Sequence, residues 1–139
     1  MTIGGGKTMA AEHPNAARMR DGYAAFSTGD FTALNDLFAD DILWHIGGRN
    51  QFTRDYHGRE KVYGLFGKMA EASGGTFAIE VHAILADDEH GIAIVVSRAT
   101  RNGKSFEIKE AHVFHLRAGK VVEFWDASTD QYAGDELFG

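Results

Sequence analysis

The sequence predicts an α+β fold, a cone-shaped barrel in which three N-terminal helices pack on a curved, mainly antiparallel sheet. Helical spacing of apolar residues dominates residues 14–72, whereas the two-residue alternation of strands dominates residues 76–126. The clearest strand pair lies in residues 105–126, where two alternating runs flank the short turn Arg117-Ala118-Gly119-Lys120. Both faces of this hairpin carry apolar side chains, so we expect a covering layer on each side of the sheet.

The composition limits the classes of protein to which this chain can belong. Its 139 residues, 44% of them hydrophobic and 24% charged, are typical of a soluble globular protein with a core of its own. A net charge of −6 without any basic run argues against a nucleic-acid partner, and no apolar run is long enough to span a membrane. The absence of cysteine excludes disulfides, a thiol nucleophile and thiolate metal ligands.

We expect a single domain over residues 13–139. Residues 1–12 are small, polar and glycine-rich, and we interpret them as a disordered tail or a remnant of cloning. They lack the basic-then-apolar order of a secretory signal, so a cytoplasmic location is the expectation.

Three helices are expected, over residues 14–29, 31–38 and 58–72. Proline is tolerated at the first turn of the first helix, and a glycine ends it. Gly64 and Gly67 are poor helix formers in the third helix, and they leave a bare surface that a strand or a ligand can approach. Apolar residues recur at helical spacing in all three: Ala16, Met19, Tyr23 and Phe26; Phe31, Leu34, Leu37 and Phe38; Val62, Leu65, Phe66 and Met69.

Strands are expected over residues 42–46, 76–86 and 91–100, followed by the two strands of the hairpin. Residues 47–57 contain glycine, charge and aromatic side chains without a period, which predicts a loop. The sequence does not assign a structure to the polar tail at 128–139.

One face of the hairpin gathers polar side chains among large apolar ones. If Leu116 pairs with Val121, this face carries the following residues: Glu110, His112, Phe114, Glu123 and Trp125. A core built for stability alone has little use for two carboxylates and an imidazole, because each buried charge must be desolvated and paired. This face therefore predicts a functional pocket.

The opposite face of the hairpin is expected to be largely apolar. It carries Ala111, Val113, Val122 and Phe124. No further helix remains in the chain to cover this face, and exposed apolar area usually marks an interface. We therefore expect a homodimer with the two sheets packed face to face.

Two segments resemble a known family. The first contains Tyr23-Ala24-Ala25-Phe26, Gly29-Asp30, Leu37-Phe38-Ala39-Asp40-Asp41 and Trp44-His45, and the second is Gly119-Lys120-Val121-Val122-Glu123-Phe124-Trp125. The chain resembles the SnoaL-like and ketosteroid-isomerase-like branch of the nuclear transport factor 2-like superfamily over residues 14–132. The superfamily includes isomerases, cyclases, dehydratases, epoxide hydrolases and proteins that only bind or scaffold, so the resemblance implies the fold more closely than the activity.

The resemblance also implies how this chain departs from ketosteroid isomerases. Ile46 stands at the position of their catalytic carboxylate, and Gly22 stands at that of their tyrosine, with Tyr23 one residue further on. His112 matches their protonated aspartate if the hairpin loop is one residue shorter here. All three positions are changed, so steroid isomerisation by the known mechanism is not expected. Arg-x-Asp, which an epoxide hydrolase of this superfamily needs, is absent from the later strands, whereas SnoaL-like cyclases use histidine and aspartate, a role open to His45 or His112.

The function expected from these residues is acid–base catalysis without a cofactor or a metal, on a small or polycyclic apolar carbonyl compound. The reaction would be of the isomerase, cyclase or dehydratase type. His112 is the main acid–base candidate, with Glu110 or Glu123 as its orienting partner and Tyr23 as a donor to a ligand oxygen. Two alternatives stay open, a core histidine bonded to these carboxylates and a metal site of Glu110, His112 and Glu123. For the whole protein, the alternative is a non-catalytic small-molecule binder or dimeric interaction module of the same fold.

Large aromatic side chains are expected to form the wall of this pocket, where they would meet a flat apolar ligand. The predicted wall consists of Trp44, Phe66, Phe114 and Trp125. His45 follows Trp44 directly, so both face the pocket only if a β-bulge intervenes.

Overall fold

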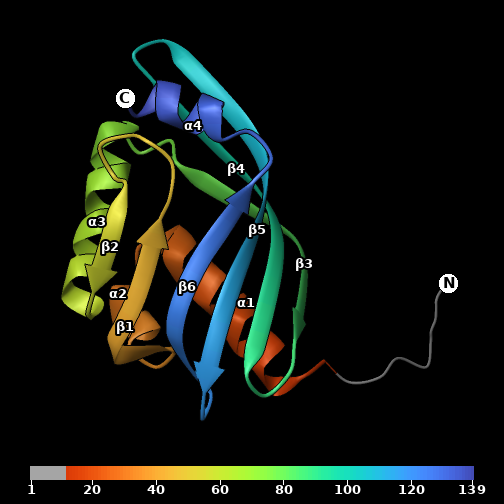
Figure 1. Ribbon diagram of the computed structural model, residues 1–139. Helices are drawn as coiled ribbons and strands as arrows, with labels where there is room; N and C mark the ends of the chain where they lie inside the picture. The colour runs from red at the N-terminus through yellow and green to blue at the C-terminus, as the bar shows by residue number, and fades with distance from the viewer. Residues whose placement is uncertain (1–11) are drawn as a thin grey trace, which may run out of the picture.

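The computed structural model of the protein describes residues 12–139 (Figure 1), so all of the predicted tail except Glu12 lies outside the described residues. The helices are α1 (Pro14–Thr28), α2 (Phe31–Leu34), α3 (Arg59–Ala72) and α4 (Gln131–Leu137). The strands are β1 (Phe38–Ile46), β2 (Arg54–His57), β3 (Ala78–Ala86), β4 (His90–Arg101), β5 (Lys104–Arg117) and β6 (Lys120–Ser128).

The six strands form one curled sheet in the order β2-β1-β6-β5-β4-β3. All neighbouring strands are antiparallel except β1 and β6, which are parallel. The α+β class and the mainly antiparallel sheet are confirmed. The sheet does not close into a barrel, because β2 and β3 remain as its two edges. In Figure 1, α1 crosses one face of the sheet, α3 lies beside β1 and β2, and α4 lies across the opposite end of the sheet from the β5–β6 turn.

Hydrogen bonds join the start of α1 to the β3–β4 turn. The His13 side chain accepts a hydrogen bond from the backbone of Asn15, and Pro14 occupies the first turn. The buried amide of Asn15 donates to the backbone oxygens of Asp87 and Asp88, at 3.0 and 3.3 Å, in the β3–β4 turn. These bonds fix the helix across the sheet, mainly against β3, and from there Tyr23 reaches His112 and Phe114 of β5.

The second predicted helix is shorter than expected. It ends at Leu34, and β1 begins at Phe38, within the residues that were expected to be helical. Phe38 pairs with Val121 of β6, and the Val121 N–H donates to the Leu37 oxygen at 2.8 Å. Sheet pairing therefore replaces the last turn that the apolar spacing predicts.

Two elements lie where the sequence predicted a loop and an unassigned tail. The loop expected over 47–57 contains β2, a charged edge strand that pairs with the second half of β1. The tail contains α4, whose N-terminus is capped by Asp130. Leu137 and Phe138 are buried at the end of the tail, and Phe138 contacts Phe52 and Phe106 edge-on. These contacts close one end of the curled sheet.

The β5–β6 hairpin has the predicted turn and a register that differs from the prediction. Ala118 and Gly119 both have positive φ, as a two-residue hairpin loop requires, and Leu116 pairs with Val121 as expected. His115, however, pairs with Glu123, so Val122 is an extra residue that forms a β-bulge. One extra residue moves every later side chain of β6 to the other face of the sheet.

The outer face of the sheet carries a row of apolar side chains. Leu85, Ile92, Val113 and Trp125 lie directly opposite one another across β3, β4, β5 and β6. Ile92 is 41% exposed and Trp125 is 38% exposed. Phe124, which was expected on this face, is only 3% exposed and belongs to the core.

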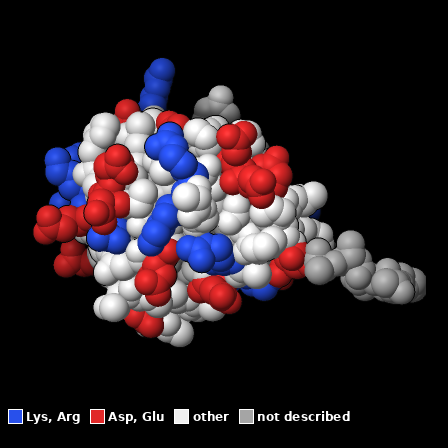
Figure 2. Space-filling view, turned by 90° about the horizontal axis from the view of Figure 1, so that it is seen from below, with Lys and Arg blue, Asp and Glu red and all other residues white. Residues whose placement is uncertain are grey.

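Charged side chains of both signs lie on the face shown in Figure 2, with acidic groups on both sides of the basic ones. Between residues 12 and 139, no helix combines the length and the apolar character that crossing a membrane demands.

Candidate functional site

The concave face of the sheet and the helices α1 and α3 line a partly open cavity of about 140 Å³. Its wall is mainly apolar and rich in aromatic side chains, and it includes three residues that the sequence placed there: Trp44, Phe66 and Phe114. Phe124 is also part of this wall, and its ring stacks on Trp44 with the ring centroids 3.7 Å apart. The fourth predicted wall residue, Trp125, lies on the outer face instead, because of the bulge at Val122.

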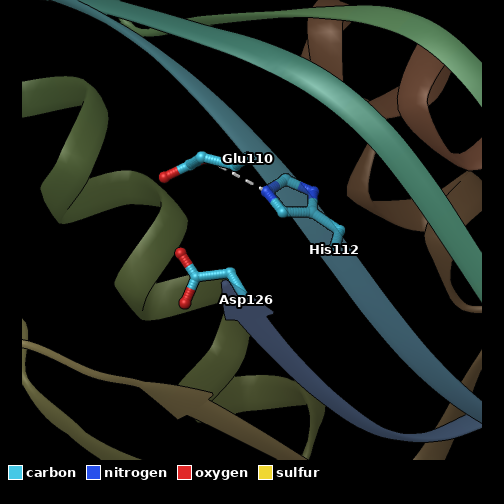
Figure 3. Close-up of side chains that lie close together, drawn as sticks. All are labelled: Glu110, His112 and Asp126. Carbon is cyan, nitrogen blue, oxygen red and sulfur yellow. Dashed lines mark hydrogen bonds and ion pairs between the residues drawn. The ribbon is translucent and has the colours of Figure 1, made fainter. Parts of the chain in front are cut away.

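A cluster of polar side chains interrupts this apolar wall. Tyr23 comes from α1, Glu110 and His112 come from β5, and Asp126 comes from the end of β6. In Figure 3 the carboxyl groups of Glu110 and Asp126 point toward the same space beside the His112 ring. One polar atom of each of these three residues lies within 4.8 Å of the others.

Three side chains of this cluster, together with Ser97 of β4, form a chain of hydrogen bonds. The Tyr23 hydroxyl lies 2.6 Å from His112 Nδ1, and His112 Nε2 lies 3.3 Å from Glu110 Oε1. The Ser97 hydroxyl donates to the same Glu110 oxygen at 2.6 Å. His112 is only 6% exposed, so this network holds it in place within the sheet.

The protonation of Tyr23 sets the direction of these bonds. Burial, and next the negative charge of Glu110, raise the pKa of Tyr23, so its hydroxyl keeps its proton and can donate it to His112 Nδ1. The proton of a neutral imidazole then sits on Nε2, which donates to Glu110. Both nitrogens of His112 are thus occupied, whereas Glu110 Oε2 has no hydrogen-bond partner among residues 12–139.

Asp126 is an ionisable residue of the cavity that the sequence did not predict. Burial raises its pKa most, the charge of Glu110 raises it further, and His112 acts in the opposite direction. Asp126 lines the cavity, and within the described residues its carboxyl group makes no hydrogen bond to another side chain. The strand pattern could not single it out, because Val121, Glu123 and Trp125 alternate as plausibly as Val122, Phe124 and Asp126.

His45 and Glu123, two of the predicted catalytic residues, lie outside the cavity. His45 is on the outer face of β1, where Nδ1 lies 2.7 Å from Asp55 Oδ1 and Nε2 lies 2.7 Å from Glu123 Oε2. The alternation of β1 is regular at Trp44, so no bulge turns His45 inward. The three side chains clamp β2, β1 and β6 together.

This clamp predicts a pH-dependent stability. The hydrogen bonds to Asp55 and then to Glu123 raise the pKa of His45 above 6.5. The protonated clamp therefore stabilises the fold fully below pH 6.5, and this contribution is lost as the pH rises through the raised pKa. We expect His45→Gln to lower the free energy of unfolding by about 1 kcal/mol or less at pH 5.5 and by less at pH 9. Urea denaturation at both pH values measures this.

His57 provides the matched control for this measurement, because it is an exposed histidine of the neighbouring strand β2. Its side chain makes no hydrogen bond within residues 12–139. His57→Gln should change stability equally at the two pH values. A loss at His45 that does not vary with pH would contradict a charged clamp.

The cavity cluster also contains the groups that could hold a metal ion. Glu110, His112 and Asp126 each offer one ligand atom, so Asp126 takes the place that the sequence gave to Glu123. A cation would need an ionised Asp126 and would replace the His112–Glu110 hydrogen bond. Metal analysis of protein purified without chelator distinguishes a cation from the hydrogen-bond network.

Comparison with known proteins assigns the family. Residues 19–124 match the family described as the SnoaL-like domain. The chain belongs to this family. It is therefore a member of the nuclear transport factor 2-like superfamily, as its fold indicates.

Solved structures similar to this SnoaL-like protein share its architecture over most of its length. Bal32a, from a soil-derived mobile gene cassette, is 36% identical with a TM-score of 0.86, and the match covers 90% of this chain and 96% of Bal32a. A protein of unknown function with a cystatin-like fold from Xanthomonas campestris is 27% identical with a TM-score of 0.85, covering 91% and 99% of the two chains. IdmH from Streptomyces antibioticus, proposed to be a polyketide cyclase, is 21% identical with a TM-score of 0.70 and covers 90% and 99%. That likeness shows the fold alone.

Relatives of the SnoaL-like protein also occur in mycobacteria. Uncharacterized proteins of Mycobacterium tuberculosis and Mycobacterium bovis are 26% identical over 121 residues, which is 86% of this chain and 92% of theirs. These relatives therefore do not indicate a function, and the residues of the cavity are the features that do.

Proposed function

We propose that this SnoaL-like protein is a cofactor-free acid–base enzyme that moves protons on a small, uncharged, mainly apolar carbonyl compound. The reaction is of the isomerase, cyclase or dehydratase type. The observation that carries the proposal is the pair of carboxyl groups of Asp126 and Glu110, with one oxygen of each within 4.8 Å of the other, in a cavity whose wall is otherwise mainly apolar. Burial and the charge of Glu110 raise the pKa of Asp126.

The two carboxyl groups suit opposite roles. Asp126, whose pKa is raised, donates its proton to the carbonyl oxygen of the substrate, where negative charge develops. Glu110 takes the proton from the adjacent carbon through Oε2, while its Oε1 is held by Ser97 and His112. His112 then acts as a positioning residue, with Tyr23 fixing its tautomer. A carboxyl group whose pKa is raised by its surroundings is a common general acid in enzymes.

The charge of the cavity restricts the substrate. The described residues that line it include Glu110 and Asp126 but no lysine or arginine. A carboxylate or phosphate ligand would find no counter-charge there and would be repelled by Glu110. The volume of about 140 Å³ favours a small compound over a polycyclic one, since an engineered cavity of about 150 Å³ in another protein holds benzene.

Deuterium incorporation tests this proposal with simple model ketones in place of the natural substrate. A panel of uncharged aryl ketones, including acetophenone, is incubated with the protein in D₂O, and exchange next to the carbonyl is followed by mass spectrometry. We expect exchange well above the buffer rate for ketones and none above it for the anionic analogue 4-acetylbenzoate. Binding of ketones without any exchange would favour the alternative, a non-catalytic small-molecule binder.

We infer further that the protein forms a homodimer through the outer face of the sheet. The apolar row on this face, which includes Ile92 and Trp125, has no covering element within residues 12–139. Ile92→Lys places a charge in the centre of this row and should convert the dimer to a monomer in light scattering at micromolar concentration. Tyr132→Lys is the control, because Tyr132 is an 88% exposed aromatic residue on α4. A monomeric wild-type protein contradicts the inference.

A further inference from the structure

A second hollow adjoins the cavity on the side of the helices. It is a groove of about 310 Å³ between the end of α1, the second half of α3 and the start of β3. The cavity and the groove share four lining residues, which form a thin partition between them: Phe26, Phe66, Phe77 and Ile79. We propose that the groove binds the apolar tail of the same ligand whose carbonyl-bearing head occupies the cavity. The identity of the head rests on the function proposed above.

The partition is built so that it can open. Phe26 contacts Phe66 and Phe77 edge-on, with ring centroids 5.0 and 6.2 Å apart. Phe66 is buried, whereas Phe26 and Phe77 are only half-buried and are therefore less confined by their neighbours. An aromatic side chain that turns aside joins the two hollows without moving the backbone.

The cavity is too small to hold a ligand with a long tail. A cavity of about 140 Å³ is filled by a head of about one ring, and a longer ligand has to extend beyond it. The groove lies directly behind the aromatic residues that the two hollows share.

The surface of the groove suits an alkyl or aryl chain. Its described lining contains no charged side chain, and it includes small residues such as Gly67 and Ala70 of α3. A Cβ atom at Gly67 would meet no atom within 4 Å, and the backbone there is not in the left-handed region. Alanine would therefore fit this helical position, so the backbone does not require glycine there, and a larger side chain would enter the groove.

Binding of a tail series tests the proposal directly. The probes are acetophenone and its 4-butyl, 4-hexyl and 4-octyl derivatives, titrated by calorimetry with the wild-type protein. Each methylene that enters an apolar groove should increase the affinity about fourfold, once the partition has opened. We expect a steady gain from butyl to octyl. A constant or falling affinity, or no binding by any member, overturns the proposal.

Two glycines of α3 provide the blocking variant and its control. Gly67→Leu fills the groove and should abolish the gain with tail length, as should Ala70→Leu. Gly64→Leu makes the same change one turn earlier in α3, where a Cβ atom also meets no atom within 4 Å. Gly64 lines neither the cavity nor the groove, so this variant should keep the increase of affinity with tail length. An equal gain in the Gly67 and Gly64 variants shows that the tail lies elsewhere. A changed oligomeric state in Gly67→Leu would make the groove a protein interface, which also overturns the proposal.

Binding and exchange are measured separately, so the two proposals can fail separately. If the tail gain is present but no ketone exchanges deuterium, the catalytic function fails and the groove stands. If ketones exchange deuterium but the tail adds no affinity, only the groove proposal fails.

Discussion

Asp126→Asn is expected to reduce deuterium exchange into a ketone by about 10²- to 10⁴-fold, the usual contribution of a positioned acid or base. Asparagine keeps the size of the side chain but has no acidic proton to give to the carbonyl oxygen. Because burial and the charge of Glu110 raise the pKa of Asp126, the wild-type protein should be active below this raised pKa and lose activity as the pH rises through it. The Asp126→Asn variant should lack this decrease in activity with rising pH.

The stability of the same variant gives an independent readout. The raised pKa of Asp126 means that the folded chain binds this proton more tightly than the unfolded chain, whose aspartate titrates near 3.8. The free energy of unfolding of the wild type therefore decreases as the pH rises from 3.8 through the raised pKa. The asparagine side chain does not ionise, so the variant should become more stable relative to the wild type over this pH range.

Glu123→Gln is the matched control for the Asp126 variant. Glu123 is an acid on the same strand, three residues earlier, but it faces the outer side and bonds His45. Exchange should be unchanged in this variant. Equal rates in wild type and Asp126→Asn would remove Asp126 from the mechanism, and a loss in Glu123→Gln instead would favour the register without a bulge.

Much of the fold could be predicted because local spacing and burial agree. The stripe that includes Met19 and Tyr23 does face the sheet, and the glycine at the β5–β6 turn does adopt a positive φ. α4 was missed although Asp130 is an ordinary helix cap, because the apolar residues that anchor the helix come only at Leu137 and Phe138.

The polar cluster could be predicted only on β5, where the alternation is unbroken. Glu110 and His112 are two residues apart on one strand, so their shared face follows from the strand period alone. Which acid of β6 joins them depends on one extra residue, Val122, and both alternating sets of β6 contain apolar residues and one acid. A bulge of this kind is chosen by tertiary packing, because burying Phe124 against Trp44 satisfies the core better than burying Glu123.

Phe124→Ala is expected to cause the largest loss of stability, about 3–5 kcal/mol in the free energy of unfolding. The ring is buried between the cavity and the sheet, stacks on Trp44, and contacts His112 and Phe114 with centroids 5.2 Å away in each case. Its removal leaves a cavity that these rigid neighbours cannot fill, so the full transfer and cavity terms apply.

Trp125→Ala is the control for this prediction, since it removes a larger side chain one residue further along the same strand. Trp125 is 38% exposed on the outer face. In a monomer, Trp125→Ala should therefore lower the free energy of unfolding by less than about half the loss expected for Phe124→Ala. Both substitutions are made in the Ile92→Lys background, which removes any contribution of dimerisation, and urea denaturation measures the free energy of unfolding. A larger loss at Trp125 than at Phe124 would mean that β6 has no bulge. In that case Glu123, not Asp126, would be the acid beside His112.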